Sequence, residues 1–196
     1  MTAPEPERPR VPRIAPLRDD ETDEQTGALL EEVRLPNAQA VNIFATLVRH
    51  PGLYRRWMPF AGKLLAGKLP ARDRELLILR SAWRCASSYE WGQHVRLATQ
   101  AGISADEIDR VAAGPGAPEW DASDRALLTA VDELHDVATL SAGTWQRLQT
   151  ILDDAQLLEL LLLAGWYRSL STVITAVELP LETWGAHFPT PTSPPQ

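Results

Sequence analysis

The sequence predicts an all-α protein, with a single helical-bundle domain of about eight helices between two proline-rich ends. Apolar residues recur at three- and four-residue spacing, which is typical of helices with one face in a core. No segment shows the sustained two-residue alternation of a strand. The 196 residues are enough for one domain with a substantial core. A hydrophobic content of 44% and a charged content of 23% are ordinary for a globular protein.

Both ends of the chain are rich in proline, which fixes φ and removes a backbone donor. Five prolines lie in the first 16 residues: Pro4, Pro6, Pro9, Pro12 and Pro16. We therefore expect an extended N-terminal arm over residues 1–20, either disordered or lying along a neighbouring subunit. The ending "FPTPTSPPQ" predicts a flexible tail over 187–196, which leaves the helical domain at 21–186.

The first three predicted helices are bounded by prolines. An amphipathic segment over 22–34 ends before Pro36, and a second helix over about 38–49 stops before Pro51. The third begins with Pro51 in its first turn, where proline is tolerated. It contains Pro59, which predicts a kink or a break.

The central part of the chain predicts two longer helices. The first covers about 70–86, with a core-facing stripe of Leu76, Leu79, Ala82 and Trp83. The second begins near Ser88 and ends near Gly102, because glycine is a common C-terminal stop.

Capping residues mark the remaining helices. Ser104 starts the capping box "SADE", Asp121 caps the next helix, and Ser141 opens a helix through Leu152. Asp153, with Gln156 three residues on, caps a long apolar helix. That helix is apolar around much of its circumference, and burying it against a partner gains roughly 25 cal/mol per Å². We therefore expect a homo-oligomer.

Charge and cysteine content narrow the function classes. A net charge of -7 argues against a nucleic-acid binder and against electrostatic docking on an anionic membrane. Cys85 is the single cysteine, so no intramolecular disulfide forms, and "MTAPEPERPRVPR" lacks the apolar stretch of a signal peptide. We expect a cytoplasmic protein. Glu159 and Arg168 interrupt the longest apolar segment, which favours a buried helix over a membrane span.

The stretch "SSYEWGQH" at 87–94 has two interpretations. In the first, Ser87 and Glu90 form an S-x-x-E capping box, so that Glu90 only caps a helix and His94 is incidental. In the second, Glu90 and His94 lie one turn apart and form an acid/base pair. Glu75 shares the face of Leu79 and Ala82 and points inward, where a carboxylate must be partnered or protonated. A turn near Ala86 would bring it to the Glu90–His94 turn.

The residues of the second interpretation resemble the carboxymuconolactone decarboxylase / alkylhydroperoxidase D-like family. The family pattern is a glutamate, about a dozen residues, then C-x-x-C-x-x-x-H. Glu75 and His94 match its glutamate and histidine, whereas Ser87 and Glu90 replace its two cysteines. The surrounding sequence is similar to a branch with Y-E-W-x-x-H, over roughly residues 35–182. The resemblance implies an alkylhydroperoxidase D-like fold and a trimer or a hexamer.

The resemblance also carries expectations about the reaction. The peroxidase members use both cysteines as a dithiol, so peroxide reduction is the least favoured activity here. Cys85 has no resolving partner, and we interpret it as a small buried residue near a helix end. The decarboxylase members need no metal or organic cofactor and act on carboxylated lactones or related carbonyl compounds. We expect a non-redox lyase or isomerase for a small-molecule substrate.

Within that resemblance, three residues are expected to be catalytic. His94 donates a proton, Glu90 sets its charge and tautomer, and Glu75 completes the relay. Candidate substrate contacts are Ser87, Tyr89, Trp91, Tyr167 and Arg84. Arg80 and Arg96 compete with Arg84 for a substrate carboxylate, and each is as readily a solvated helix residue.

One interpretation from another class stays open, a binding or structural oligomer that kept the fold without turnover, which would bind organic acids without forming product. We expect no metal site, because His50, His135 and His187 show no metal-ligand spacing and no second cysteine is present.

Overall fold

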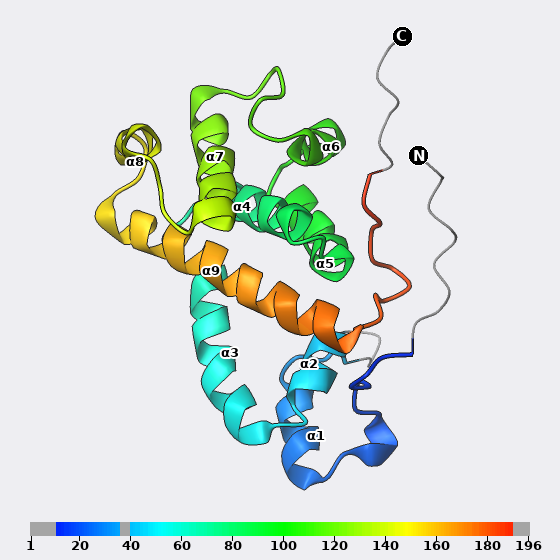
Figure 1. Cartoon of the computed structure of the whole chain (residues 1–196). Helices are drawn as coiled ribbons and strands as arrows, with labels where there is room; N and C mark the ends of the chain where they lie inside the picture. The colour runs from blue at the N-terminus through cyan, green and yellow to red at the C-terminus, as the bar shows by residue number, and fades with distance from the viewer. Residues whose placement is uncertain (1–10, 36–39, 190–196) are drawn as a thin grey trace. The chain divides into compact units, whose positions relative to one another are not determined.

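The computed structural model describes residues 11–35 and 40–189, and within them it is all-helical (Figure 1). Extended pairing among these residues is limited to an isolated bridge between Arg34 and Ala40. Backbone contacts divide the chain into two compact units. One contains the residues up to Lys63 together with Val173–Trp184, and the other contains Leu64–Thr172 and the residues from Gly185 onward.

The first unit holds a 3₁₀ turn at Asp19–Glu21, helix α1 at Glu24–Glu31, helix α2 at Asn42–Leu47 and most of α3 at Pro51–Leu65. Its core is built on Leu30, Ala45, Val48 and Tyr54.

The described part of the N-terminal arm is hydrogen-bonded to its own chain. The Leu17 N–H donates to the carbonyl of Ala45 at 2.9 Å, and the Arg13 N–H donates to that of Val177 at 2.8 Å. Pro4, Pro6, Pro9 and Pro36 lie outside the described residues.

Helix α3 runs without a break through Pro59, so the break predicted as one alternative is wrong. Pro59 is on the exposed face. The carbonyl that its missing N–H would have paired with is therefore free to bond water, which lets the helix continue.

The second unit holds the larger core. It contains α4 at Ala71–Arg84, α5 at Ser88–Gln100, α6 at Ala105–Ala113, α7 at Ala122–Val137, α8 at Ala142–Gln149 and α9, whose full span is Asp154–Val177. Helix α4 contacts α5, α6 and α7. Four consecutive residues of it, from Leu76 to Leu79, are 0% exposed, because neighbours cover α4 on every side.

The capping signals of the sequence are used in this unit. The side chains of Ser104, Asp121 and Ser141 each accept from the backbone N–H three residues on. Asp153 and Gln156 cap α9 reciprocally, at 2.8 and 2.9 Å.

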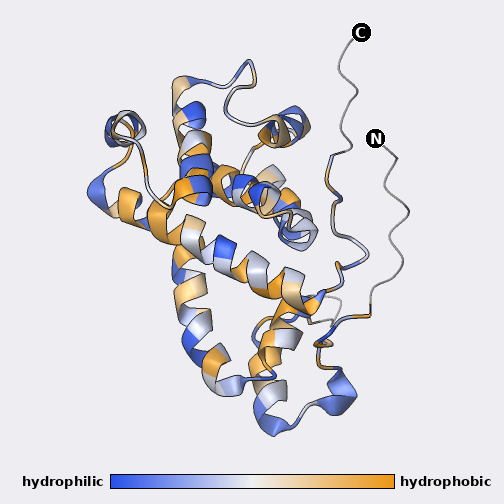
Figure 2. Ribbon diagram, viewed as in Figure 1, coloured by the Kyte–Doolittle hydropathy of each residue, from blue (hydrophilic) through white to orange (hydrophobic). Residues whose placement is uncertain are grey.

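Helix α9 is long and apolar enough to cross a membrane by length and composition, and hydrophobic residues predominate along its ribbon (Figure 2). Within its most apolar window, 39% of the residues are buried in the protein. Leu157, Leu160, Leu163 and Tyr167 belong to the core of the second unit, so one face of α9 is a core face.

Candidate functional site

The turn between α4 and α5 brings Glu75 to the Glu90–His94 segment. Helix α4 ends at Arg84, Ala86 just beyond it has a positive φ of 51°, and the Ser87 N–H donates back to the carbonyl of Ala82 at 2.9 Å. This closure of a helix C-terminus reverses the chain direction within a few residues. As a result, Glu75, Glu90 and His94 come together, with exposed fractions of 2%, 3% and 5%.

His94 lies between two carboxylates. Its Nδ1 is 2.8 Å from Glu75 Oε2, and its Nε2 is 3.7 Å from Glu90 Oε2. A hydrogen on Nδ1 is placed to donate to Glu75 Oε2, and this contact leaves Nε2 facing Glu90. Glu75 is thus the residue that orients the ring, the part that the sequence analysis gave to Glu90.

Glu90 is a buried carboxyl group with unused bonding capacity. Its Oε1 has no hydrogen-bond partner among the described residues. Burial raises the pKa of Glu90 to about 7, against the opposing effect of a charged His94. This carboxyl therefore exchanges its proton near neutral pH, which is where a general acid or base is most effective.

The capping interpretation holds for Ser87 but not for the Glu90 side chain. Ser87 is the N-cap of α5, and its hydroxyl oxygen accepts from the Glu90 N–H at 3.5 Å. A capping box also needs the glutamate side chain to bond the Ser87 N–H, and that N–H donates to Ala82 instead. Glu90 is left to face His94.

Two further side chains contact this trio. The Tyr167 ring from α9 meets the His94 ring edge-on, with centroids 5.0 Å apart. Burial raises the pKa of Tyr167 well above its usual range, so its hydroxyl stays protonated and able to donate. Arg74 Nε lies 3.4 Å from Glu75 Oε1. The sequence analysis missed Arg74, although its position beside Glu75 on one helix was a usable signal.

Two of the remaining predicted contacts, Arg84 and Trp91, have other partners. Arg84 pairs with Asp132 at 3.6 Å and with Asp136, both on α7. Trp91 is 1% exposed and stacks with Trp83 and Phe188 in an aromatic cluster, as a core residue does. Tyr89 is buried, at 3% exposed. Of the rival arginines, Arg80 is bound to Asp132 and to the carbonyl of Val111.

The arrangement suits proton transfer. One imidazole is held by one carboxylate and faces a second carboxyl with a near-neutral pKa, in a site largely closed to water. Among the described residues no group of three or more His, Cys, Asp or Glu side chains is placed to hold a metal ion.

Comparison with known proteins finds similarity to a sequence family and to solved folds. The sequence model of the carboxymuconolactone decarboxylase family matches residues 51–133, which include Glu75, Glu90 and His94. No curated protein matches the chain.

Several solved structures share the fold. The debrominase Bmp8, solved alone and with 2,3,4-tribromopyrrole, is 14% identical with a TM-score of 0.73, over 87% of this chain and 92% of that one. An alkylhydroperoxidase AhpD core protein from Ralstonia eutropha JMP134 is 15% identical with a TM-score of 0.72, over 87% and 93%. A protein of unknown function from Agrobacterium tumefaciens is 18% identical with a TM-score of 0.63, over 68% and 94%.

Proposed function

Because residues 51–133 place this chain in the carboxymuconolactone decarboxylase family, we propose that it is a cofactor-independent acid/base enzyme. Its reaction is a decarboxylation or an isomerisation of a small organic acid, lactone or enolisable carbonyl compound. The observation that carries the proposal is the buried row Glu75–His94–Glu90. In it, one Glu90 oxygen has no hydrogen-bond partner among the described residues, and the pKa of Glu90 is about 7.

Both reactions use the same proton. In a decarboxylation, the bond to the substrate carboxylate breaks, CO₂ leaves, and the electron pair stays on carbon, delocalised into the adjacent carbonyl. The Glu90–His94 pair then protonates that carbon and recovers its proton from solvent. In an isomerisation, the pair first removes a proton from carbon and returns it at another position. Glu75 keeps Nε2 of His94 aimed at Glu90 throughout.

Two groups beside the row support a charged carbonyl substrate. The Tyr167 hydroxyl stays protonated and offers a donor to an enolate oxygen. Arg74 brings positive charge next to Glu75 and so balances part of the negative charge in the site.

Two alternative functions for this fold are thiol-dependent peroxide reduction and non-catalytic ligand binding. Thiol-dependent peroxide reduction by the family's dithiol needs two cysteines, and the chain has only Cys85. A non-catalytic binding oligomer of the same fold would bind organic acids and release no product.

The test is product formation from a panel of carboxylated lactones, β-keto acids and enolisable ketones. We expect at least one compound to release CO₂, or to exchange its α-hydrogen in D₂O by ¹H NMR, faster with the protein than without it. Peroxide consumption with a thiol donor should stay at background. If every compound in the panel behaves as it does with His94→Asn, the proposal fails.

The variants Glu75→Gln, Glu90→Gln and His94→Asn should each lower kcat on that compound by roughly 10²-fold or more. Combining them should not multiply the losses, since groups that act as a unit fail as a unit. Glu31→Gln is the matched control, because its side chain is 73% exposed on α1. Parental kcat in Glu90→Gln would remove Glu90 from the mechanism.

A further inference from the structure

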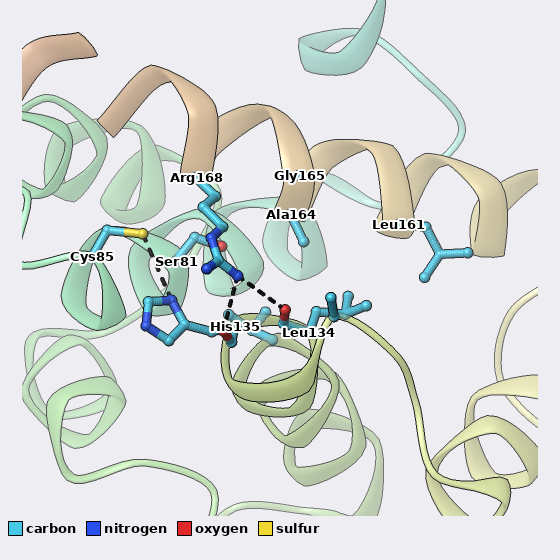
Figure 3. A pocket seen from close by; sticks show the side chains of 10 residues that line it. Ser81, Cys85, Leu134, His135, Leu161, Ala164, Gly165 and Arg168 are labelled. Atoms are coloured by element: carbon cyan, nitrogen blue, oxygen red, sulfur yellow. Dashed lines mark hydrogen bonds between the residues drawn. The ribbon is translucent and has the colours of Figure 1, made fainter. Parts of the chain in front are cut away.

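A cavity of about 360 Å³ opens in the second unit, and the residues of the candidate acid/base row do not line it. Its polar lining consists of Ser81 on α4, Cys85 just after α4, His135 in the last turn of α7 and Arg168 on α9 (Figure 3). The Ser81 hydroxyl already donates to the carbonyl of Leu77. The rest of the wall is mostly apolar, including Val131, Leu134, Leu161 and Ala164. The cavity therefore suits a small apolar body with one polar group.

The cysteine in this cavity is paired with a base. Cys85 Sγ lies 3.8 Å from His135 Nδ1. Burial raises the pKa of Cys85, so the sulfur carries its proton at neutral pH. Burial, with the charges of Arg84 and Arg168, lowers the pKa of His135, so the imidazole is the free base. A neutral thiol beside a neutral imidazole is a nucleophile with its general base in place.

The Ser171 hydroxyl lies beside the Cys85–His135 pair. Its side chain is 1% exposed and interacts with the Cys85 thiol. Apart from that thiol, its hydroxyl has no hydrogen-bond partner among the described residues. A hydroxyl that donates to sulfur stabilises the thiolate more than the thiol, which favours reaction at this sulfur.

Arg168 completes the polar set. Its Nη1 donates to the carbonyls of His135 at 2.8 Å and Leu134 at 3.3 Å, which holds the guanidinium over the end of α7 (Figure 3). Guanidinium has five N–H donors. The hydrogens not used by these carbonyls can meet a ligand oxygen.

We propose that this cavity is a second site, which takes small apolar α,β-unsaturated carbonyl compounds and adds the Cys85 thiol to them. The S–H proton passes to His135 Nδ1 as sulfur bonds to the β-carbon. The electron pair of the C=C bond moves to the enolate, whose oxygen Arg168 stabilises. His135 then returns the proton to the α-carbon, so that the thiol has added across the double bond with no oxidant or reductant. This reaction does not depend on the proposed acid/base function.

The test compares N-benzylacrylamide with acrylamide, two probes with the same reactive group and different apolar bodies. The rate of adduct formation on Cys85 is followed by intact-protein mass spectrometry and divided by the rate of each probe with glutathione. We expect the N-benzylacrylamide rate to saturate with concentration, and its normalised rate to exceed that of acrylamide by about tenfold or more. A linear concentration dependence with equal normalised rates would overturn the proposal.

Two variants separate the cavity from a merely reactive thiol. A Cβ at Gly165 meets no atom within 4 Å, so Gly165→Leu has room to fold and covers the cavity. It should slow N-benzylacrylamide at least tenfold and acrylamide much less. Gly62→Leu, at another helical glycine with open space around it, should react like the parent. Equal rates of N-benzylacrylamide in Gly165→Leu and Gly62→Leu would refute a pocket-directed reaction.

The adduct rate of a His135 variant tests whether His135 acts as the base for the Cys85 thiol. His135→Asn should lower the adduct rate of both probes by tenfold or more, because the thiol loses its base. His50→Asn is the control, since His50 lies in the first unit and is exposed. Circular dichroism melting confirms that both variants are folded. If His135→Asn, folded, reacts as fast as His50→Asn, Cys85 acts without His135 and the assigned mechanism is wrong.

Discussion

Glu90 shows at the scale of one residue how burial changes a carboxyl group. Its side chain is almost wholly enclosed, one oxygen has no hydrogen-bond partner among the described residues, and the other lies 3.7 Å from His94 Nε2. Desolvation then outweighs the charge of His94 and raises the pKa to about 7. An ordinary exposed glutamate loses its proton well below pH 7, whereas Glu90 changes charge near neutrality.

This pKa predicts an unusual pH dependence of stability. The folded protein holds the Glu90 proton more tightly than the unfolded chain, whose carboxyl has the ordinary pKa of 4.5. The stabilising contribution is therefore complete below about pH 4.5 and is lost as the pH rises through about 7. The loss above that pH is about 3 kcal/mol, from 1.36 kcal/mol per pKa unit.

Glu90→Gln cannot titrate and should remove this dependence. Its free energy of unfolding, relative to the parent, should increase between pH 5 and pH 8 by a few kcal/mol. Urea unfolding at the two pH values measures it, with Glu31→Gln as the control that changes little at either. A constant difference between Glu90→Gln and the parent would contradict the raised pKa.

At the scale of elements, α4 is fastened to its neighbours by a buried arginine. Arg80 is 7% exposed by side chain and pairs with Asp132 of α7 through Nε at 2.7 Å and Nη2 at 2.8 Å. Its Nη1 donates to the carbonyl of Val111 in α6 at 2.8 Å. One side chain thus joins three helices, which fixes the helix that carries Glu75.

Removing the anion from this buried pair should be costly. Asp132→Ala leaves the Arg80 charge without its partner and should lower the free energy of unfolding by about 3–5 kcal/mol. Asp136→Ala, on the same helix, removes a carboxylate that is 55% exposed and should cost less than about 1 kcal/mol. Denaturant unfolding measures the loss of unfolding free energy in each variant. Equal losses would show that burial does not strengthen the Arg80–Asp132 ion pair.

At the scale of the whole molecule, α9 exposes large hydrophobic residues beside its core face. Leu158 is 61% exposed and Leu162 is 51% exposed, one turn apart on the helix. Contiguous exposed leucines on a helix commonly mark an interaction surface. We propose that this face joins copies of the chain in a homo-oligomer, a trimer or a hexamer.

Light scattering after size-exclusion chromatography tests the assembly. The parent should elute as an oligomer at micromolar concentration, and Leu158→Asp with Leu162→Asp should shift the mass toward a monomer, because charges would be buried at the interface. Val137→Asp is the control, since Val137 is 65% exposed and lies on α7 rather than on α9. A parent that elutes as a monomer would refute the assembly.

The sequence by itself determined which segments are helices and where most of them begin. Ser104, Asp121, Ser141 and Asp153 cap the helices that they were expected to cap. Such caps join residues only three positions apart, so chain neighbours are enough to predict them. The inward position of Glu75 also followed from the helical period, because a residue three or four positions from core leucines shares their face.

Only the tertiary structure decided how these residues work together. The helical period and a predicted turn placed Glu75 and Glu90 near His94. The direction of each side chain brought Nδ1 to Glu75 and left one oxygen of Glu90 without a partner in the described part of the chain. Packing also placed Cys85 beside His135, 50 positions away, on an open cavity, where a buried structural cysteine was expected. Contacts between distant segments depend on how whole helices pack, and no local pattern in the chain records that geometry.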